Sequence, residues 1–130
     1  MTPFPFWRSI AYAEHSTKQR WHAKARIALR SLAHKLELAP GTYCVRSNYG
    51  GVAVSGESIL HGEHIYVQVA QVGVLEILFR RCNGRGDYTG AENHFARLPM
   101  LNEPEALAAL IEGELGPCYK SNANAVMCWT

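Results

Sequence analysis

Residues 64–81 read HIYVQVAQVGVLEILFRR, and this stretch decides the fold. Its first half alternates as a half-buried strand does, and the apolar face of that strand consists of Ile65, Val67 and Val69. Val72-Gly73 has the composition of a turn, and Val74–Arg81 then predicts a further strand. The apolar face of this second strand consists of Leu75, Ile77 and Phe79. Because so short a link joins the two strands, we expect them to pair antiparallel.

Two more strands are predicted on the N-terminal side, at Thr42–Asn48 and Val52–His61. Tyr49-Gly50-Gly51 is the expected turn between them. Gly62-Glu63 suits a two-residue hairpin turn with glycine at its first position. Four consecutive strands with such short links predict an antiparallel meander.

A helix is predicted on each side of the strands. Glu14–Leu38 carries apolar residues at helical spacing, namely Trp21, Ala25, Ala28, Leu29, Leu32 and Leu36. We expect Ser16 or Thr17 to cap its start and Pro40-Gly41 to end it. The second helix is expected to follow Asn102 as its cap, to run over Glu103–Leu115 and to stop at Gly116-Pro117. Its expected apolar face consists of Ala106, Leu107, Leu110 and Ile111.

These elements predict an α+β fold with an N-terminal helix, a four-stranded antiparallel meander and a C-terminal helix, packed as a two-layer sandwich. The segment Gly84–Pro99 is expected to be irregular. The chain fits one domain, with an aromatic arm at 1–13, a core at 14–116 and a tail at 117–130. Both helices should cover one face of the sheet. The other face should be more exposed and carry some of the residues Cys44, Arg46, Tyr66, Gln68, Glu76 and Arg80.

Composition and cysteine usage favour a cytoplasmic protein. Hydrophobic residues make up 48% of the chain and charged residues 18%, and the net charge is only +2. This charge is far from the strong basic excess expected of a protein that contacts many phosphates. The start of the chain lacks a secretory signal, and no stretch approaches the roughly 20 apolar residues that span a membrane. We therefore expect the four cysteines to be reduced thiols.

Two polar loops are the main candidates for a binding site. Both leave a predicted strand through arginine, asparagine and glycine, at 46–51 and at 80–90. If they leave the same end of the sheet, their arginine forks and glycine amides form one concave surface that suits anionic groups. The alternative is plain turn chemistry. The predicted partner-binding residues are Arg46, Asn48, Tyr49, Arg80, Arg81, Arg85 and Tyr88.

The first helix offers an alternative, nucleic-acid-binding surface. His22, Arg26, Arg30 and His34 recur every four residues and are expected to form one basic ridge. Such a ridge suits phosphates or an acidic protein surface. The alternative is a solvated helix face.

Metal binding and catalysis have weaker support. His61 and His64 flank the predicted hairpin turn and would face each other, but a metal needs further ligands, for which only Cys44 and Cys82 are candidates. Cys82 lies in an electropositive loop and His94 is close in sequence, which raises the alternative of a cysteine-dependent enzyme. No established catalytic motif is present, and we expect neither a metal nor a cofactor.

The block from Tyr43 to Phe95 resembles uncharacterised small proteins of bacterial mobile elements. The resemblance implies an accessory or anti-defence role and says nothing of individual residues. With the absent catalytic motif and the arginine- and tyrosine-rich loops, it favours a non-enzymatic binding module that acts on a protein or nucleoprotein partner. The alternatives are direct nucleic-acid binding and a small cysteine-dependent enzyme. The sequence does not indicate an oligomeric state.

Overall fold

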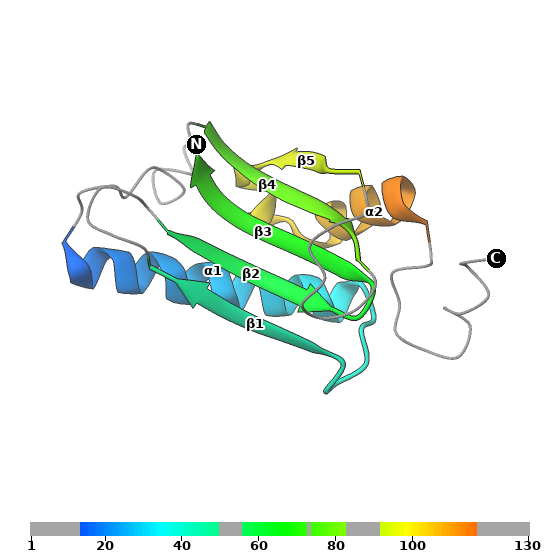
Figure 1. The fold of residues 1–130 in the computed structure, drawn as a ribbon, viewed down its shortest axis with the longest axis horizontal. Coiled ribbons are helices and arrows are strands. Elements are labelled where there is room, and N and C mark those ends of the chain that lie inside the picture. Colours follow the sequence, from blue (N-terminus) through cyan, green and yellow to red (C-terminus); the bar gives the residue numbers. More distant parts are fainter. Residues whose placement is uncertain (1–13, 50–55, 73, 83–91, 117–130) are drawn as a thin grey trace.

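The computed structural model describes residues 14–49, 56–72, 74–82 and 92–116. A long helix comes first, five strands and a short 3-10 helix follow, and a second helix ends the described chain (Figure 1). The elements are α1 (His15–Lys35), β1 (Tyr43–Asn48), β2 (Glu57–Gly62), β3 (Ile65–Val72), β4 (Val74–Arg81), β5 (His94–Arg97), η1 (Leu98–Asn102) and α2 (Pro104–Leu115). The predicted arm at 1–13 and tail at 117–130 lie outside the described residues.

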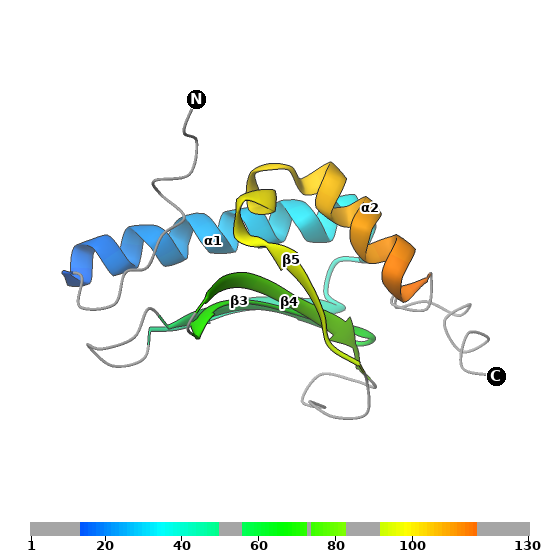
Figure 2. The same ribbon diagram turned by 90° about the horizontal axis from the view of Figure 1, so that it is seen from above.

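The molecule has two layers, with both helices on one side of the sheet (Figure 2). The strands follow one another in the order β1-β2-β3-β4-β5, and every neighbouring pair is antiparallel. The predicted α+β class, with a helix at each end of a meander, is therefore confirmed. None of the helices in the described segments is both long enough and apolar enough to cross a membrane.

The prediction of four strands is wrong, because β5 lies in the segment 84–99 that was expected to be irregular. Four residues, His94–Arg97, pair with β4 in a register that sets Phe95 opposite Leu78. Within so short a segment the alternation of buried and exposed side chains repeats only once. The strand forms because β4 offers it a free edge and because Ala96 is buried on the helix side.

The hairpin between β2 and β3 also differs from the prediction. Gly62 stays in β2, opposite Tyr43 of β1, and the two linking residues are Glu63 and His64. A Cβ atom at Gly62 would lie 3.1 Å from the Ile65 side chain, so this glycine serves a close approach and not a turn. His61 consequently faces Tyr66, not His64.

The core lies between the helices and the inner face of the sheet. The predicted apolar stripe of α1 is confirmed, since Trp21, Ala25, Leu29, Leu32 and Leu36 are all buried there. The sheet contributes Leu60, Ile65, Val67, Val69, Ile77 and Phe79. Burial of each large apolar side chain contributes about 1.5–3 kcal/mol. On α2 the buried residues are Leu107, Ala108, Ile111 and Leu115, whereas Ala106, expected inside, is exposed.

The second helix ends at Leu115 with Gly116 as its cap, as predicted, but the end of α1 and the starts of both helices differ from the prediction. α1 stops at Lys35, before the expected proline–glycine stop. Glu37 adopts a left-handed conformation (φ 62°), its N–H donates to the carbonyl of His34, and the N–H of Leu38 donates to that of Ala33. This pair of bonds is a Schellman motif, in which glycine is the usual left-handed residue. The expected side-chain caps are absent at both described helix starts, where glutamates occupy the N-cap positions.

Candidate interaction surface on the outer face of the sheet

The outer face of the sheet, the side turned away from α1 and α2, is organised in three cross-strand rows. The first row is Cys44, His61, Tyr66 and Arg80. The second row is Arg46, Ile59, Gln68, Leu78 and Phe95. The third row is Asn48, Glu57, Ala70, Glu76 and Arg97. The six residues that the alternation assigned to this face all occur in these rows.

The first row is a packed stack around Tyr66. The His61 ring meets the Tyr66 ring edge-on, with centroids 5.0 Å apart, and the guanidinium carbon of Arg80 lies 5.4 Å from the Tyr66 centroid. Tyr66 Oη donates a hydrogen bond of 2.5 Å to Gln68 Oε1. Tyr66 and Arg80 are buried, although this row was expected to be more exposed. Arg80 therefore makes a cation–π contact with Tyr66 in the middle of this face.

The second row ends in a large hydrophobic side chain that is exposed to solvent. Phe95 is 54% exposed and lies beside half-buried Leu78. Ile59 and Leu78 pack with Tyr66 into a small apolar cluster, separate from the main core. At the other end of the row, Arg46 Nη1 donates to Cys44 Sγ at 3.3 Å. The row thus combines an apolar end at β5 with a cationic end at β1.

The third row mixes both signs of charge. Glu57 stands opposite Asn48, and the position of Glu76 is opposite that of exposed Arg97. Such a mixture does not favour the evenly spaced negative charges of a nucleic-acid backbone. The outer face is therefore polar, aromatic and arginine-bearing without being uniformly basic.

The two predicted polar loops do not share an end of the sheet. Asn48 closes β1 in the third row, whereas Arg81 closes β4 opposite Ile65, beyond the first row. The reason is topological, because the first and fourth strands of an antiparallel meander run in opposite directions. The strand ends that lead into the two loops therefore lie at opposite ends of the sheet, and the condition for one concave surface is not met. Arg85 and Tyr88 lie outside the described residues.

Arg81, expected to bind a partner, points to the helix side and holds the end of α2. Its Nε donates to the carbonyl oxygen of Leu115 at 2.9 Å, and its Nη2 donates to the same oxygen. A cation at this position also complements the negative end of the helix dipole. Arg81 is thus a structural cap, a role that sequence spacing alone does not reveal.

A buried polar cluster lies beneath α1, formed by His22, Arg26, Ser47 and Ser58. His22 Nδ1 is 2.9 Å from Ser58 Oγ, which is 2.7 Å from Ser47 Oγ, and Arg26 Nη1 donates to Ser47 Oγ at 2.7 Å. Tyr49 stacks on His22 with centroids 4.5 Å apart and an interplanar angle of 13°. Because His22 and Ser58 are fully buried, the cluster ties α1 to β1 and β2 and does not offer a reactive hydroxyl to a substrate.

The cluster breaks up the predicted basic ridge. A row of residues spaced by four drifts about 40° per step around a helix with 3.6 residues per turn. His22 is accordingly buried and Arg26 is half-buried, while Arg30 and His34 reach solvent. Tyr49, predicted to contact a partner, is likewise engaged by His22. The inward positions of Ser47 and Ser58, opposite each other on paired strands, were the missed sequence signal.

The remaining chemistry is separated in space. Cys82 belongs to the outer-face cluster and its Sγ donates to the Gly62 carbonyl at 3.5 Å. His94 stacks on Phe79 on the helix side, and its Nδ1 lies 3.2 Å from Glu114 Oε1. The proposed Cys82–His94 pair is thus divided by the sheet. Across the described segments, no three His, Cys, Asp or Glu residues are grouped as metal ligands would be.

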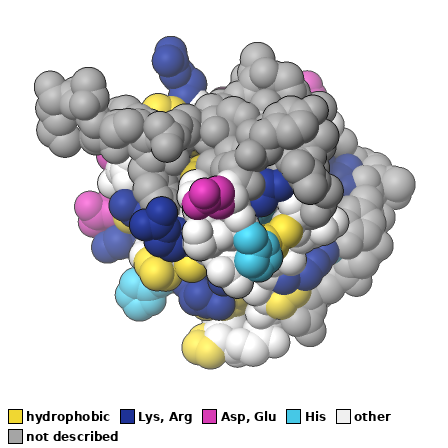
Figure 3. Space-filling view, turned by 90° about the vertical axis from the view of Figure 1, so that its left-hand side faces the viewer, with side chains coloured by type: hydrophobic (Ala, Val, Ile, Leu, Met, Phe, Trp, Pro, Cys, Tyr) yellow, Lys and Arg dark blue, Asp and Glu magenta, His cyan; other side chains and the backbone are white. Residues whose placement is uncertain are grey.

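The basic residues of α1 that remain accessible include Arg20, Lys24, Arg30 and Lys35. At the end of the molecule where α1 begins, Lys and Arg side chains are interspersed with acidic, histidine and hydrophobic side chains (Figure 3). The accessible basic residues of α1 thus do not make this end uniformly basic.

Comparison of the chain with protein-family models, curated proteins and solved structures gave no match.

Proposed function

We propose that this protein is a non-enzymatic binding module that docks a protein partner at the β5 edge of the outer face of its sheet, with Phe95 as the apolar anchor. The observation that carries the proposal is the 54% exposure of Phe95 on a face that neither helix covers. Aromatic and arginine side chains are enriched among the residues that dominate binding energy, and Arg97 lies two positions along β5 on the same face.

The size of the anchor effect follows from its exposed area. Full burial of a phenylalanine side chain from water is worth about 1.5–3 kcal/mol, so covering the exposed half of Phe95 contributes about 0.8–1.6 kcal/mol. Desolvation of the neighbouring Leu78 adds to this value. An anchor that also excludes water from its surroundings therefore supports an effect of about tenfold or more in affinity.

A protein partner is favoured over a nucleic acid by the charges of the described residues. The third row carries acidic positions, and Arg80 is already engaged by Tyr66. On α1, His22 and Arg26 are held in the buried cluster and are not free to contact phosphates. Binding of a nucleic acid would instead show an affinity that falls steeply with salt.

The resemblance of residues 43–95 to small proteins of bacterial mobile elements supports an accessory or anti-defence setting within this proposal. The partner would then be a protein or nucleoprotein complex of the host or of a competing element. Identification of the partner would test whether the protein acts in such a setting.

The test is affinity capture from a native-host extract with the full chain, the Phe95→Ser variant and the Ala109→Ser variant. Ala109 is the matched control, because it is an exposed apolar residue of α2 in the other layer. We expect a partner that the native chain and Ala109→Ser retain and that Phe95→Ser loses, in nuclease-treated extract. Equal recovery of every partner by all three proteins would overturn the proposal.

A further inference from the structure

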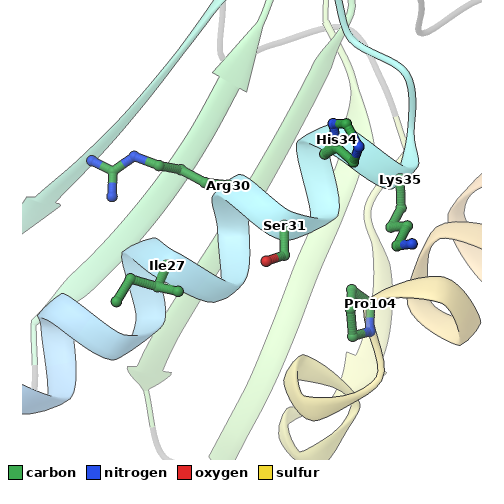
Figure 4. A pocket seen from close by; sticks show the side chains of 6 residues that line it. All are labelled: Ile27, Arg30, Ser31, His34, Lys35 and Pro104. Carbon is green, nitrogen blue, oxygen red and sulfur yellow. The ribbon is translucent and has the colours of Figure 1, made fainter.

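A groove of about 390 Å³ lies on the solvent side of α1, where α2 begins (Figure 4). Five of its lining residues belong to α1 and the sixth is the first residue of α2, namely Ile27, Arg30, Ser31, His34, Lys35 and Pro104. This site is on the opposite layer from Phe95, so an argument built on it does not depend on the outer face.

The groove combines an apolar part with a cationic border. Ile27 is 61% exposed, which is unusual for an isoleucine on an otherwise polar helix side, and the Pro104 ring supplies a second apolar surface. Arg30 and Lys35 supply the positive charges from different sides, and His34 lies next to Lys35 (Figure 4). Lys35 Nζ lies 3.3 Å from Glu105 Oε2, but both side chains are well exposed and such surface pairs are weak.

This chemistry selects one class of occupant. We propose that the groove binds an acidic peptide segment of a protein partner, with one large apolar side chain of the segment packed against Ile27 and Pro104. Carboxylates on either side of that anchor then pair with Arg30 and Lys35, and the arginine fork can hold a carboxylate in two hydrogen bonds. A nucleic-acid strand is disfavoured, because it would have to pass its phosphates over isoleucine and proline.

The test is subtractive selection of a random 12-residue peptide library on the immobilised full chain. Peptides that bind the native protein are passed over the immobilised Arg30→Glu variant, and those that also bind this variant are removed. The affinities of the surviving peptides are measured by fluorescence anisotropy. Ile27 and Arg30 are exposed, so their substitution does not disturb the core. Arg20→Glu is the matched control, since Arg20 is an exposed arginine of the same helix that does not line the groove.

We expect the survivors to be acidic with at least one large apolar residue. Their affinity should fall about tenfold for Arg30→Glu and several-fold for Ile27→Ser, and change by less than about twofold for Arg20→Glu. The proposal is overturned if no peptide survives counter-selection, if the survivors are not acidic, or if Arg20→Glu weakens them as much as Arg30→Glu. It is equally overturned if a 12-nucleotide single strand binds the groove more tightly than the peptides do. None of these outcomes bears on whether Phe95 is required for capture of a partner in the test of the proposed function.

Discussion

Replacement of Arg81 by alanine should destabilise the fold, because Arg81 joins the end of β4 to the end of α2. Its guanidinium donates twice to the Leu115 carbonyl, and Leu115 itself is buried. Hydrogen bonds to a charged group contribute about 1.5–3 kcal/mol, and a cation at a helix C-terminus adds about 0.3–1 kcal/mol. The arginine is half-buried, so solvent screening reduces these values. We expect a net loss of about 2 kcal/mol in the free energy of unfolding.

The assay is urea unfolding followed by far-UV circular dichroism, with thermal melting as a second readout. A loss of about 2 kcal/mol lowers the melting temperature by roughly 6–10 °C in a domain of this size. Arg81→Lys keeps the charge but cannot donate from a planar fork, so its loss should be about half as large. Arg97→Ala removes the same side chain from an exposed position of the neighbouring strand and should change stability by less than about 0.5 kcal/mol.

Equal unfolding midpoints for Arg81→Ala and Arg97→Ala would refute this reasoning. If Arg81→Ala were as stable as the native chain and still lost a partner, the role predicted from sequence would be restored and the capping role would be wrong. The comparison therefore separates the two functions that have been assigned to this residue.

Three further substitutions test the local geometry by the same unfolding assay. Glu37→Gly should raise the free energy of unfolding by about 0.5–1 kcal/mol, because φ at this position is 62°; an unchanged or lower value would contradict the left-handed helix end. Ser58→Ala should cost about 1–3 kcal/mol, since it removes the hydroxyl that joins His22 to Ser47, whereas Ser31→Ala on the solvent side should cost less than about 0.5 kcal/mol. Equal costs for the two serines would rule out the buried cluster. Gly56→Ala should destabilise by more than about 1 kcal/mol, because φ is 82° and the new Cβ would lie 2.4 Å from the Asn48 carbonyl oxygen; native-like stability would show that β1 and β2 do not meet in this way.

The parts of the fold that could be predicted are those with a repeated pattern. The apolar stripe around Leu29 repeats over the length of α1, and Val67 and Ile77 lie in long alternating runs. Such repetition fixes both the type of element and its buried face. By contrast, β5 is too short to repeat, and its pairing depends on the edge that β4 provides. Glu37 occupies a left-handed position at which glycine is the usual residue, so the sequence does not mark this helix end.

The candidate surfaces were less predictable, because they depend on direction and register. The strand alternation correctly assigned Arg46 and Arg80 to the outer face, but it could not show that Tyr66 engages Arg80. The expectation that both loops leave the same end of the sheet did not take strand direction into account. The first and fourth strands of an antiparallel meander run in opposite directions, so they end at opposite ends of the sheet. The basic ridge failed because spacing by four drifts around the helix and brings His22 into the interior. Phe95 was overlooked because its strand was overlooked.

The central claim is that the outer face binds a protein partner through Phe95. Its most direct test is isothermal titration of the captured partner against the native chain, Phe95→Ser and Ala109→Ser, with the three unfolding midpoints measured beforehand. The account predicts that Phe95→Ser weakens the binding, raising the dissociation constant by about tenfold or more at an unchanged midpoint. It also predicts that Ala109→Ser binds within about twofold of the native chain. Equal dissociation constants for the native chain and Phe95→Ser would contradict the claim.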